Sequence, residues 1–239
     1  MTSIVFSIVL ILLPLGGQEA EQAGVSSQVG LPLVMGVLGK AHASGSLRYS
    51  GRCEAGPGKR FDFPKLQSPQ KVSDDPVAAL REIFADDPQM RVTRDANGFI
   101  RMVEADVPRD LLDVRFKRIA FRDDEAHPPK DVRYVPRDAM WAILSRPEVS
   151  AFMRDHEIAR RFDIEDASGR RPIPSPAMPR LSDSLNDVTL SEALDNVLRT
   201  FPGLWIYENC PSKNGKRVVD FGIYANDPMW SVSSRLDGP

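Results

Sequence analysis

Two histidines and two cysteines are the residues of this chain best suited to catalysis or metal binding. Beyond residue 43 the only histidines are His127 and His156, and the only cysteines in the chain are Cys53 and Cys210. A Ser-His-Asp triad uses histidine as its general base, so a hydrolase would have to employ one of these two. The sequence contains no Gly-x-Ser-x-Gly pattern that would mark a hydrolase nucleophile. We therefore identify no catalytic residues.

The segment from His156 to Arg160 differs by one residue from the zinc-binding pattern His-Glu-x-x-His. That pattern places two imidazoles on one face of a helix, where both can hold the metal. Here Arg160 occupies the second ligand position and would repel a cation. His156 also follows Val149, Phe152 and Met153 on an apolar helical face. The pattern therefore predicts a packed or helix-terminal histidine, and we predict no metal site.

Other patterns give no reason to expect a cofactor or a nucleic acid. The sequence has no Gly-rich phosphate loop of either common type, and Asp123–Glu125 has the composition of a solvated acidic turn. The basic residues around Phe116 alternate with it, which is typical of an outward strand face. The net charge of −2 stays close to zero without the first 43 residues, so nothing indicates attraction to nucleic acid.

The two cysteines form a candidate disulfide. Cys53 and Cys210 are an even pair without a Cys-x-x-Cys partner, and two unrelated thiols are the alternative. A bridge between them requires an oxidising compartment. A disulfide between these two cysteines would therefore agree with export of the protein.

The start of the chain resembles a leader for export. Ile4–Leu15 is an apolar run of signal-peptide length, and a second apolar patch, Leu31–Leu38, leads to Ala41-His42-Ala43. We expect residues 1–43 to be removed, which leaves Ser44 as the new N-terminus. A cut near Gly17, an uncleaved membrane anchor and a misassigned start codon are the alternatives. After cleavage we expect no stable membrane span and a periplasmic or secreted protein.

The rest of the chain predicts an α+β fold with two β-α-β-β units joined by short helices. The later unit, about 186–224, has a helix from Leu190 with Thr189 as its cap, followed by a hairpin around Asn214-Gly215. The earlier unit, about 60–103, has a helix that begins at Asp75-Pro76 and a hairpin whose turn ends at Gly98. The predicted segments are a flexible lead-in at 44–59, a first unit with added helices at 60–165, a Pro-rich linker at 166–180 and a second unit with a tail at 181–239.

The segment Asp187-Val-Thr-Leu-Ser-Glu-Ala-Leu-Asp-Asn-Val-Leu, with Gly203-Leu-Trp-Ile-Tyr207 after it, resembles the short N-terminal domain of secretins and TonB-dependent receptors. The resemblance covers about 186–224 and, more weakly, 76–103. It implies a periplasmic β-α-β-β interaction module without catalytic residues. The chain departs from this family because no pore or receptor barrel follows, and because Cys210-Pro211 interrupts the hairpin.

These observations predict an exported, non-enzymatic interaction module of the cell envelope. Its partner is expected to be another envelope protein, which would add a strand to an exposed sheet edge. The alternative is a small secreted hydrolase that uses His127 or His156 with an unrecognised nucleophile. We expect no cofactor in either case.

Overall fold

The computed structural model describes residues 27–51, 63–68, 73–121, 133, 135–161, 179–211 and 216–227. It confirms the predicted α+β class, with a six-stranded mixed sheet in the order β2-β3-β1-β7-β8-β5 and a separate pair, β4-β6. The elements are α1 (Ser27–Lys40), β1 (Gly45–Ser50), α2 (Pro76–Ile83), β2 (Met90–Arg94), β3 (Ile100–Glu104), β4 (Arg115–Ala120), α3 (Pro136–Leu144), α4 (Pro147–Asp155), β5 (Ile158–Arg160), β6 (Ser184–Thr189), α5 (Leu190–Thr200), β7 (Gly203–Pro211) and β8 (Arg217–Ala225).

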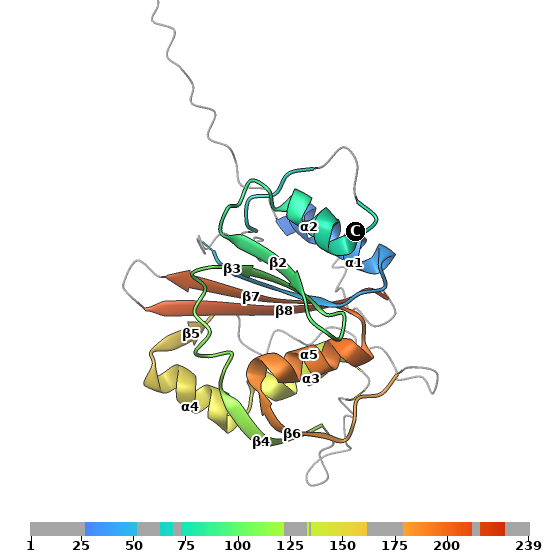
Figure 1. Ribbon diagram of the computed structural model, residues 1–239. Helices are drawn as coiled ribbons and strands as arrows, with labels where there is room; N and C mark the ends of the chain where they lie inside the picture. Colours follow the sequence, from blue (N-terminus) through green and yellow to red (C-terminus); the bar gives the residue numbers. More distant parts are fainter. Residues whose placement is uncertain are drawn as a thin grey trace, which may run out of the picture.

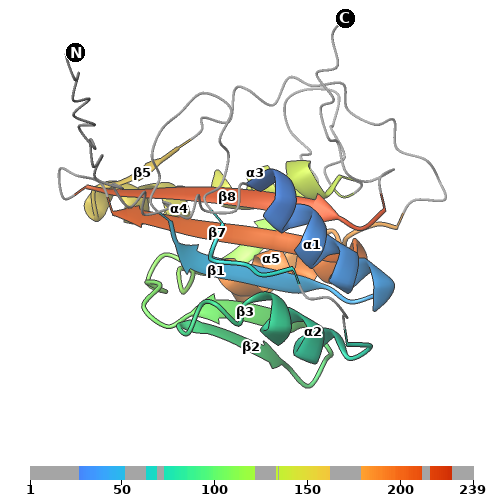
Figure 2. The ribbon, with the colours of Figure 1, turned by 90° about the horizontal axis from the view of Figure 1, so that it is seen from above.

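Helices cover both faces of the large sheet (Figure 1). Helices α1 and α2 lie on one face and α3 and α5 on the other, and Figure 2 shows α1 and α2 running over the strands. Side chains alternate along β7, so Leu204 and Ile206 pack towards α1 and α2 while Trp205 and Tyr207 pack towards α5. The sheet therefore separates two apolar cores.

The local signals of the first predicted unit are confirmed. Asp75 caps α2 by accepting a 3.0 Å hydrogen bond from the amide of Ala78, and Pro76 opens the helix. Strands β2 and β3 form the expected antiparallel hairpin. Gly98 in its turn has a φ of 81°, a conformation that other residues rarely adopt.

The cap of α5 is also confirmed. Thr189 accepts a 3.2 Å hydrogen bond from the amide of Glu192, whose carboxylate accepts a 2.8 Å bond from the amide of Thr189. Strands β7 and β8 pair antiparallel after this helix, as predicted. The Asn214-Gly215 turn between them lies outside the described residues.

The predicted flexible lead-in is wrong for its first part. Gly45–Ser50 form β1, which lies in the interior of the sheet and pairs parallel with both β3 and β7. The first unit therefore has the order β1-α2-β2-β3 and starts earlier than residue 60. Its first strand carries glycine, serine and arginine in place of an apolar run, which is why the composition suggested a loop.

The two predicted units, 60–165 and 181–239, share one sheet. Strands from both sides of the Pro-rich segment share one sheet, because β1 pairs with β7 and β5 pairs with β8. The later unit does have the order β6-α5-β7-β8, but β6 pairs with β4 of the earlier unit. Residues 162–178, which hold most of the predicted linker, lie outside the described residues.

The second apolar patch of the predicted leader is a packed helix. In α1, Val34 and Leu38 are fully buried in the core that also contains Leu47 and Ile206. Removal of residues 1–43 stays a prediction, and it would take this helix away from the sheet. No helix in the described ranges has both the length and the apolar character needed to cross a membrane.

Candidate functional site

A buried arginine lies on the face of β1 that α5 covers. Leu47 and Tyr49 point towards α1 and α2, so Arg48 between them points the other way. Only 5% of its surface is exposed. The guanidinium carbon lies 4.8 Å from the centre of the Trp205 ring, and Nη2 donates a 2.6 Å hydrogen bond to the hydroxyl of Ser191. Stacking and one hydroxyl thus hold a cation inside the protein.

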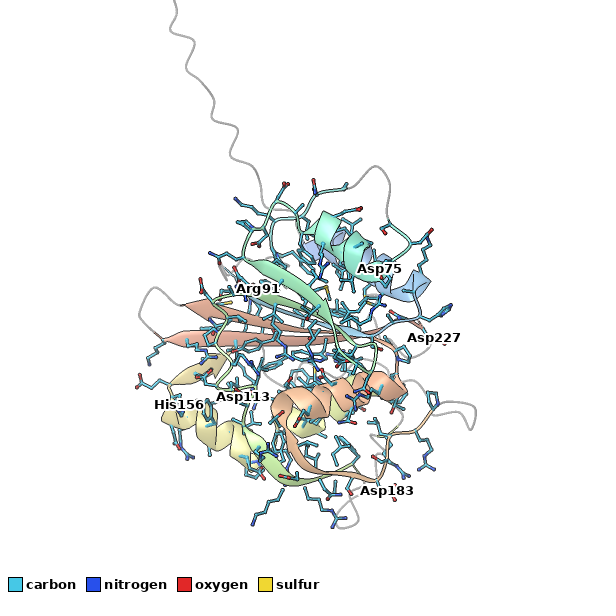
Figure 3. The ribbon with its side chains drawn as sticks, viewed as in Figure 1. Asp75, Arg91, Asp113, His156, Asp183 and Asp227 are labelled. Carbon is cyan, nitrogen blue, oxygen red and sulfur yellow. The ribbon has the colours of Figure 1, made fainter. Side chains whose placement is uncertain are left out.

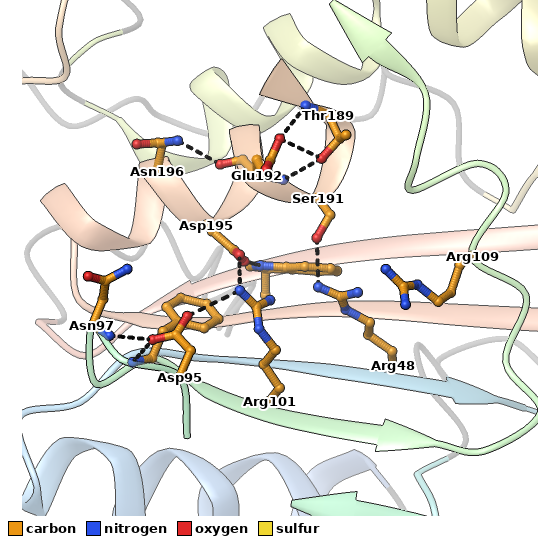
Figure 4. Close-up of polar contacts among 12 residues, drawn as sticks. Arg48, Asp95, Asn97, Arg101, Arg109, Thr189, Ser191, Glu192, Asp195 and Asn196 are labelled. Atoms are coloured by element: carbon orange, nitrogen blue, oxygen red, sulfur yellow. Dashed lines mark hydrogen bonds and ion pairs between the residues drawn. The ribbon is translucent and has the colours of Figure 1, made fainter. Parts of the chain in front are cut away.

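Asp195 on α5 fixes the helix on this face of the sheet. It is 2% exposed and accepts a 2.8 Å hydrogen bond from Trp205 Nε1. Its other oxygen forms a 2.9 Å ion pair with Arg101 on β3, which also pairs with Asp95 at 3.3 Å. A buried carboxylate is tolerated only with such partners. Figure 4 shows how this network places Ser191, one turn earlier on α5, above β1.

A second guanidinium lies beside the first. Figure 4 shows the guanidinium groups of Arg109 and Arg48 turned towards one another. The Arg109 side chain is 67% exposed, and its ion pair with Asp113 is long, at 3.7 Å. The fully buried Leu111 and Leu112 anchor the segment that carries Arg109 between β3 and β4.

An ion pair holds the same segment to β8. Both oxygens of Asp110 accept 2.7 Å hydrogen bonds from Arg217, which also donates 2.5 Å bonds to Tyr207 and Asn209. Burial would raise the pKa of Asp110, but the hydrogen bonds from Arg217 and from the amide of Leu111 hold it below its ordinary value. Burial raises the pKa of the Tyr207 hydroxyl. The backbone of Arg109 is therefore fixed from both sides.

The electrostatics of Arg48 distinguish it from the other arginines of the site. Burial lowers its pKa to about 10; Asp195 opposes this shift, and the charges of Arg101 and Arg109 add to it. It stays protonated at neutral pH. Its Nε has no hydrogen-bond partner among the described residues, and Ser191 is the one acceptor they offer it. Guanidinium groups donate hydrogen bonds and do not exchange protons at neutral pH, so this arrangement suits binding of an anionic group.

The candidate metal pattern spans two elements. His156 is the exposed C-cap of α4 (Figure 3). Its ring stacks on Phe152 with centroids 3.9 Å apart, and its Nδ1 lies 2.9 Å from the Phe152 carbonyl. This agrees with the predicted helix-terminal histidine. Arg160 lies on β5 and donates a 2.9 Å bond to the Leu144 carbonyl. Within the described ranges no cluster of three or more metal-binding side chains occurs, and His127 lies outside them.

The disulfide stays a prediction, because Cys53 lies outside the described residues. Cys210 lies on β7, is 1% exposed, and is not a free thiol. The amide of Gly51, two residues before Cys53, donates a 2.9 Å hydrogen bond to the carbonyl of Asn209. The described backbone therefore brings the approach to Cys53 alongside Cys210.

Sequence reasoning missed Arg48, Arg101 and Arg109. The alternation of Leu47 and Tyr49 around Arg48 was a signal for a strand, but the neighbouring glycine and serine residues outweighed it. The other two arginines belong to no motif. No family model, curated protein or solved structure matches the chain, so the site rests on its own geometry.

Proposed function

We propose that this protein is an exported, non-enzymatic interaction module of the cell envelope, and that it contacts its partner around Arg48 and Arg109. The observation that carries the proposal is a buried arginine with one acceptor beside a second, exposed arginine. Such groups bind and orient an anionic group but do not carry out acid–base chemistry. The resemblance of the Asp187–Tyr207 segment to the secretin and TonB-receptor domain supports the same class of function.

The edge of β2 is less suited to adding a partner strand. The amide of Asp95 donates a 3.0 Å hydrogen bond to the carbonyl of Phe99 across the hairpin. Because the pattern alternates in antiparallel pairs, the backbone groups of Val92 point away from β3. Arg81 on α2 donates 3.2 and 3.0 Å bonds to the Val92 carbonyl, so an added strand would have to displace it. This protected edge favours the surface around Arg48 and Arg109, here called the arginine surface, as the place of contact.

Site-specific photo-cross-linking tests the proposal in cells that export the protein. A photoreactive residue replaces Asp113, which lies beside Arg109, and in a control it replaces the exposed Ser150 on α4. We expect a defined adduct from position 113 alone, and we expect Arg109→Gln to abolish it. Equal adducts at both positions, or an adduct that persists with Arg109→Gln, would contradict the proposal.

The same assay separates the interaction module from the hydrolase alternative. Replacing both His127 and His156 by glutamine removes the only histidines beyond residue 43. An interaction module should still form the adduct at position 113, because neither histidine belongs to the arginine surface. Loss of the protein's cellular function with the adduct intact would favour the hydrolase.

A further inference from the structure

We infer that Arg48 and Arg109 together form a binding site for one carboxylate group, supplied by an acidic side chain or the C-terminus of a partner protein. This inference rests on the proposed interaction function and names the chemistry of its contact. It goes beyond that function because it assigns the ligand group, its charge and the two residues that hold it.

The unused hydrogen-bonding capacity of Arg48 points to a missing acceptor. A guanidinium carries five N–H donors, and at this buried position the described residues satisfy one nitrogen through Ser191. Nε is fully buried without a partner. A buried donor without an acceptor is costly, and an oxygen placed beside Nε would remove that cost. The carboxylate fits this need because its two oxygens match the planar fork of a guanidinium.

The position of Arg109 points to a negative charge between the two side chains. Like charges that face each other raise the energy of both, and the Arg109 charge is one of the causes that lower the pKa of Arg48. An anion between them converts this repulsion into two attractions. Arg109 is largely exposed, so it can swing to meet an incoming group, while Arg48 is held by Trp205.

The local balance of charge favours a singly charged group. Arg101 is paired with two aspartates, which leaves that half of the network negative. Among the described residues, Asp195 and Asp113 both act on Arg48, and Asp113 also lies 3.7 Å from Arg109, so the three arginines of the network face three aspartates. A carboxylate adds one negative charge to this balanced network, whereas a doubly charged phosphate would add about two.

The start of α5 contributes its dipole but no free amide to the site. The amide of Leu190 donates a 2.8 Å bond to the Val114 carbonyl, and that of Ser191 donates a 3.0 Å bond to the Leu112 carbonyl. The third amide, of Glu192, is taken by the N-cap. The carboxylate must therefore bind to the two arginine side chains, with the positive end of the helix dipole nearby.

The test is a titration followed by proton–nitrogen NMR of arginine Nε–H groups in the exported protein. The Arg48 signal is assigned by its absence in Arg48→Lys, and acetate, inorganic phosphate or chloride is added at equal ionic strength. We expect a saturable shift of the Arg48 signal with acetate and a weaker one with phosphate. Arg109→Gln should lower acetate affinity about tenfold or more, since a hydrogen bond to a charged group contributes at least that factor.

Arg154→Gln on α4 is the matched control, since it removes the same charge from a side chain that is 76% exposed. It should leave acetate binding unchanged. No saturable shift with acetate, equal affinity in Arg109→Gln, or tighter binding of phosphate would each overturn the carboxylate site. An adduct at position 113 without acetate binding would leave the interaction function standing and refute this inference. Acetate binding without an adduct would support the carboxylate site and contradict the proposed interaction function.

Discussion

In protein that retains α1, replacing Leu38 by alanine should lower the free energy of unfolding by about 2–5 kcal/mol. Leu38 on α1 is fully buried and packs in the core with Leu47, Ile206 and Leu204. The substitution removes three carbon atoms, which accounts for about 2.4 kcal/mol at roughly 0.8 kcal/mol per buried carbon. The cavity that remains between α1 and the sheet adds the rest.

The assay is urea unfolding of protein recovered after export. The slope of unfolding free energy against urea concentration is compared between variant and wild type, because an equal slope shows that the denatured state is unchanged. Val37→Ala is the matched control, because Val37 is only partly buried on the same helix and should cost less. N-terminal sequencing of the same samples shows which residues remain. If Leu38→Ala protein that retains α1 unfolds like the wild type, the reasoning from the burial of Leu38 is refuted. Samples that begin at Ser44 would show that α1 is removed on export, and the comparison is then made on the unprocessed chain.

Four further predictions concern the cap of α5, the turn before β3 and the cysteines. Thr189→Ala should cost about 1 kcal/mol in chemical unfolding. The hydrogen bond from the Thr189 amide holds the pKa of Glu192 below its ordinary value. The stabilisation that the Glu192 carboxylate contributes is therefore present above the unfolded pKa, about 4.3, and is lost as pH falls through the folded pKa. Glu192→Gln should flatten the dependence of unfolding free energy on pH in this range. Gly98→Val should cost about 1–3 kcal/mol, measured by thermal melting, because of its positive φ. A Cys53–Cys210 disulfide should contribute up to about 5 kcal/mol, and alkylation of both cysteines without reductant would disprove it.

The elements that were predicted correctly are specified by residues close to them in sequence. The caps of α2 and α5 involve side chains within three positions of the amides they bind, and the β2–β3 turn needs only Gly98. The apolar face of α5 also follows from spacing alone. Such signals can be read without knowing what the helix or hairpin packs against.

The strand β1 could not be predicted in the same way, because distant residues stabilise it. Arg48 is compatible with a buried strand only when Trp205 covers its guanidinium and Ser191 accepts its hydrogen bond. Both partners lie more than 140 residues away in the sequence. No tight turn joins β1 to β7, so their parallel pairing leaves no local signal in the sequence. The sharing of one sheet by the two predicted units could not be read from the sequence for the same reason.

The polar groups of the site make the two halves of the chain depend on each other. Asp195 lies on the buried face of α5, where an unpaired carboxylate would be strongly destabilising. One of its partners, Arg101, comes from the earlier half of the chain and the other, Trp205, from the later half. Arg48 belongs to the earlier half, and the groups that hold it, Ser191 and Trp205, both come from the later half. Neither half can bury its own charged residue without the other. The arginine surface should therefore exist only when all of the sheet has formed, so the protein would present its binding surface in the folded state alone.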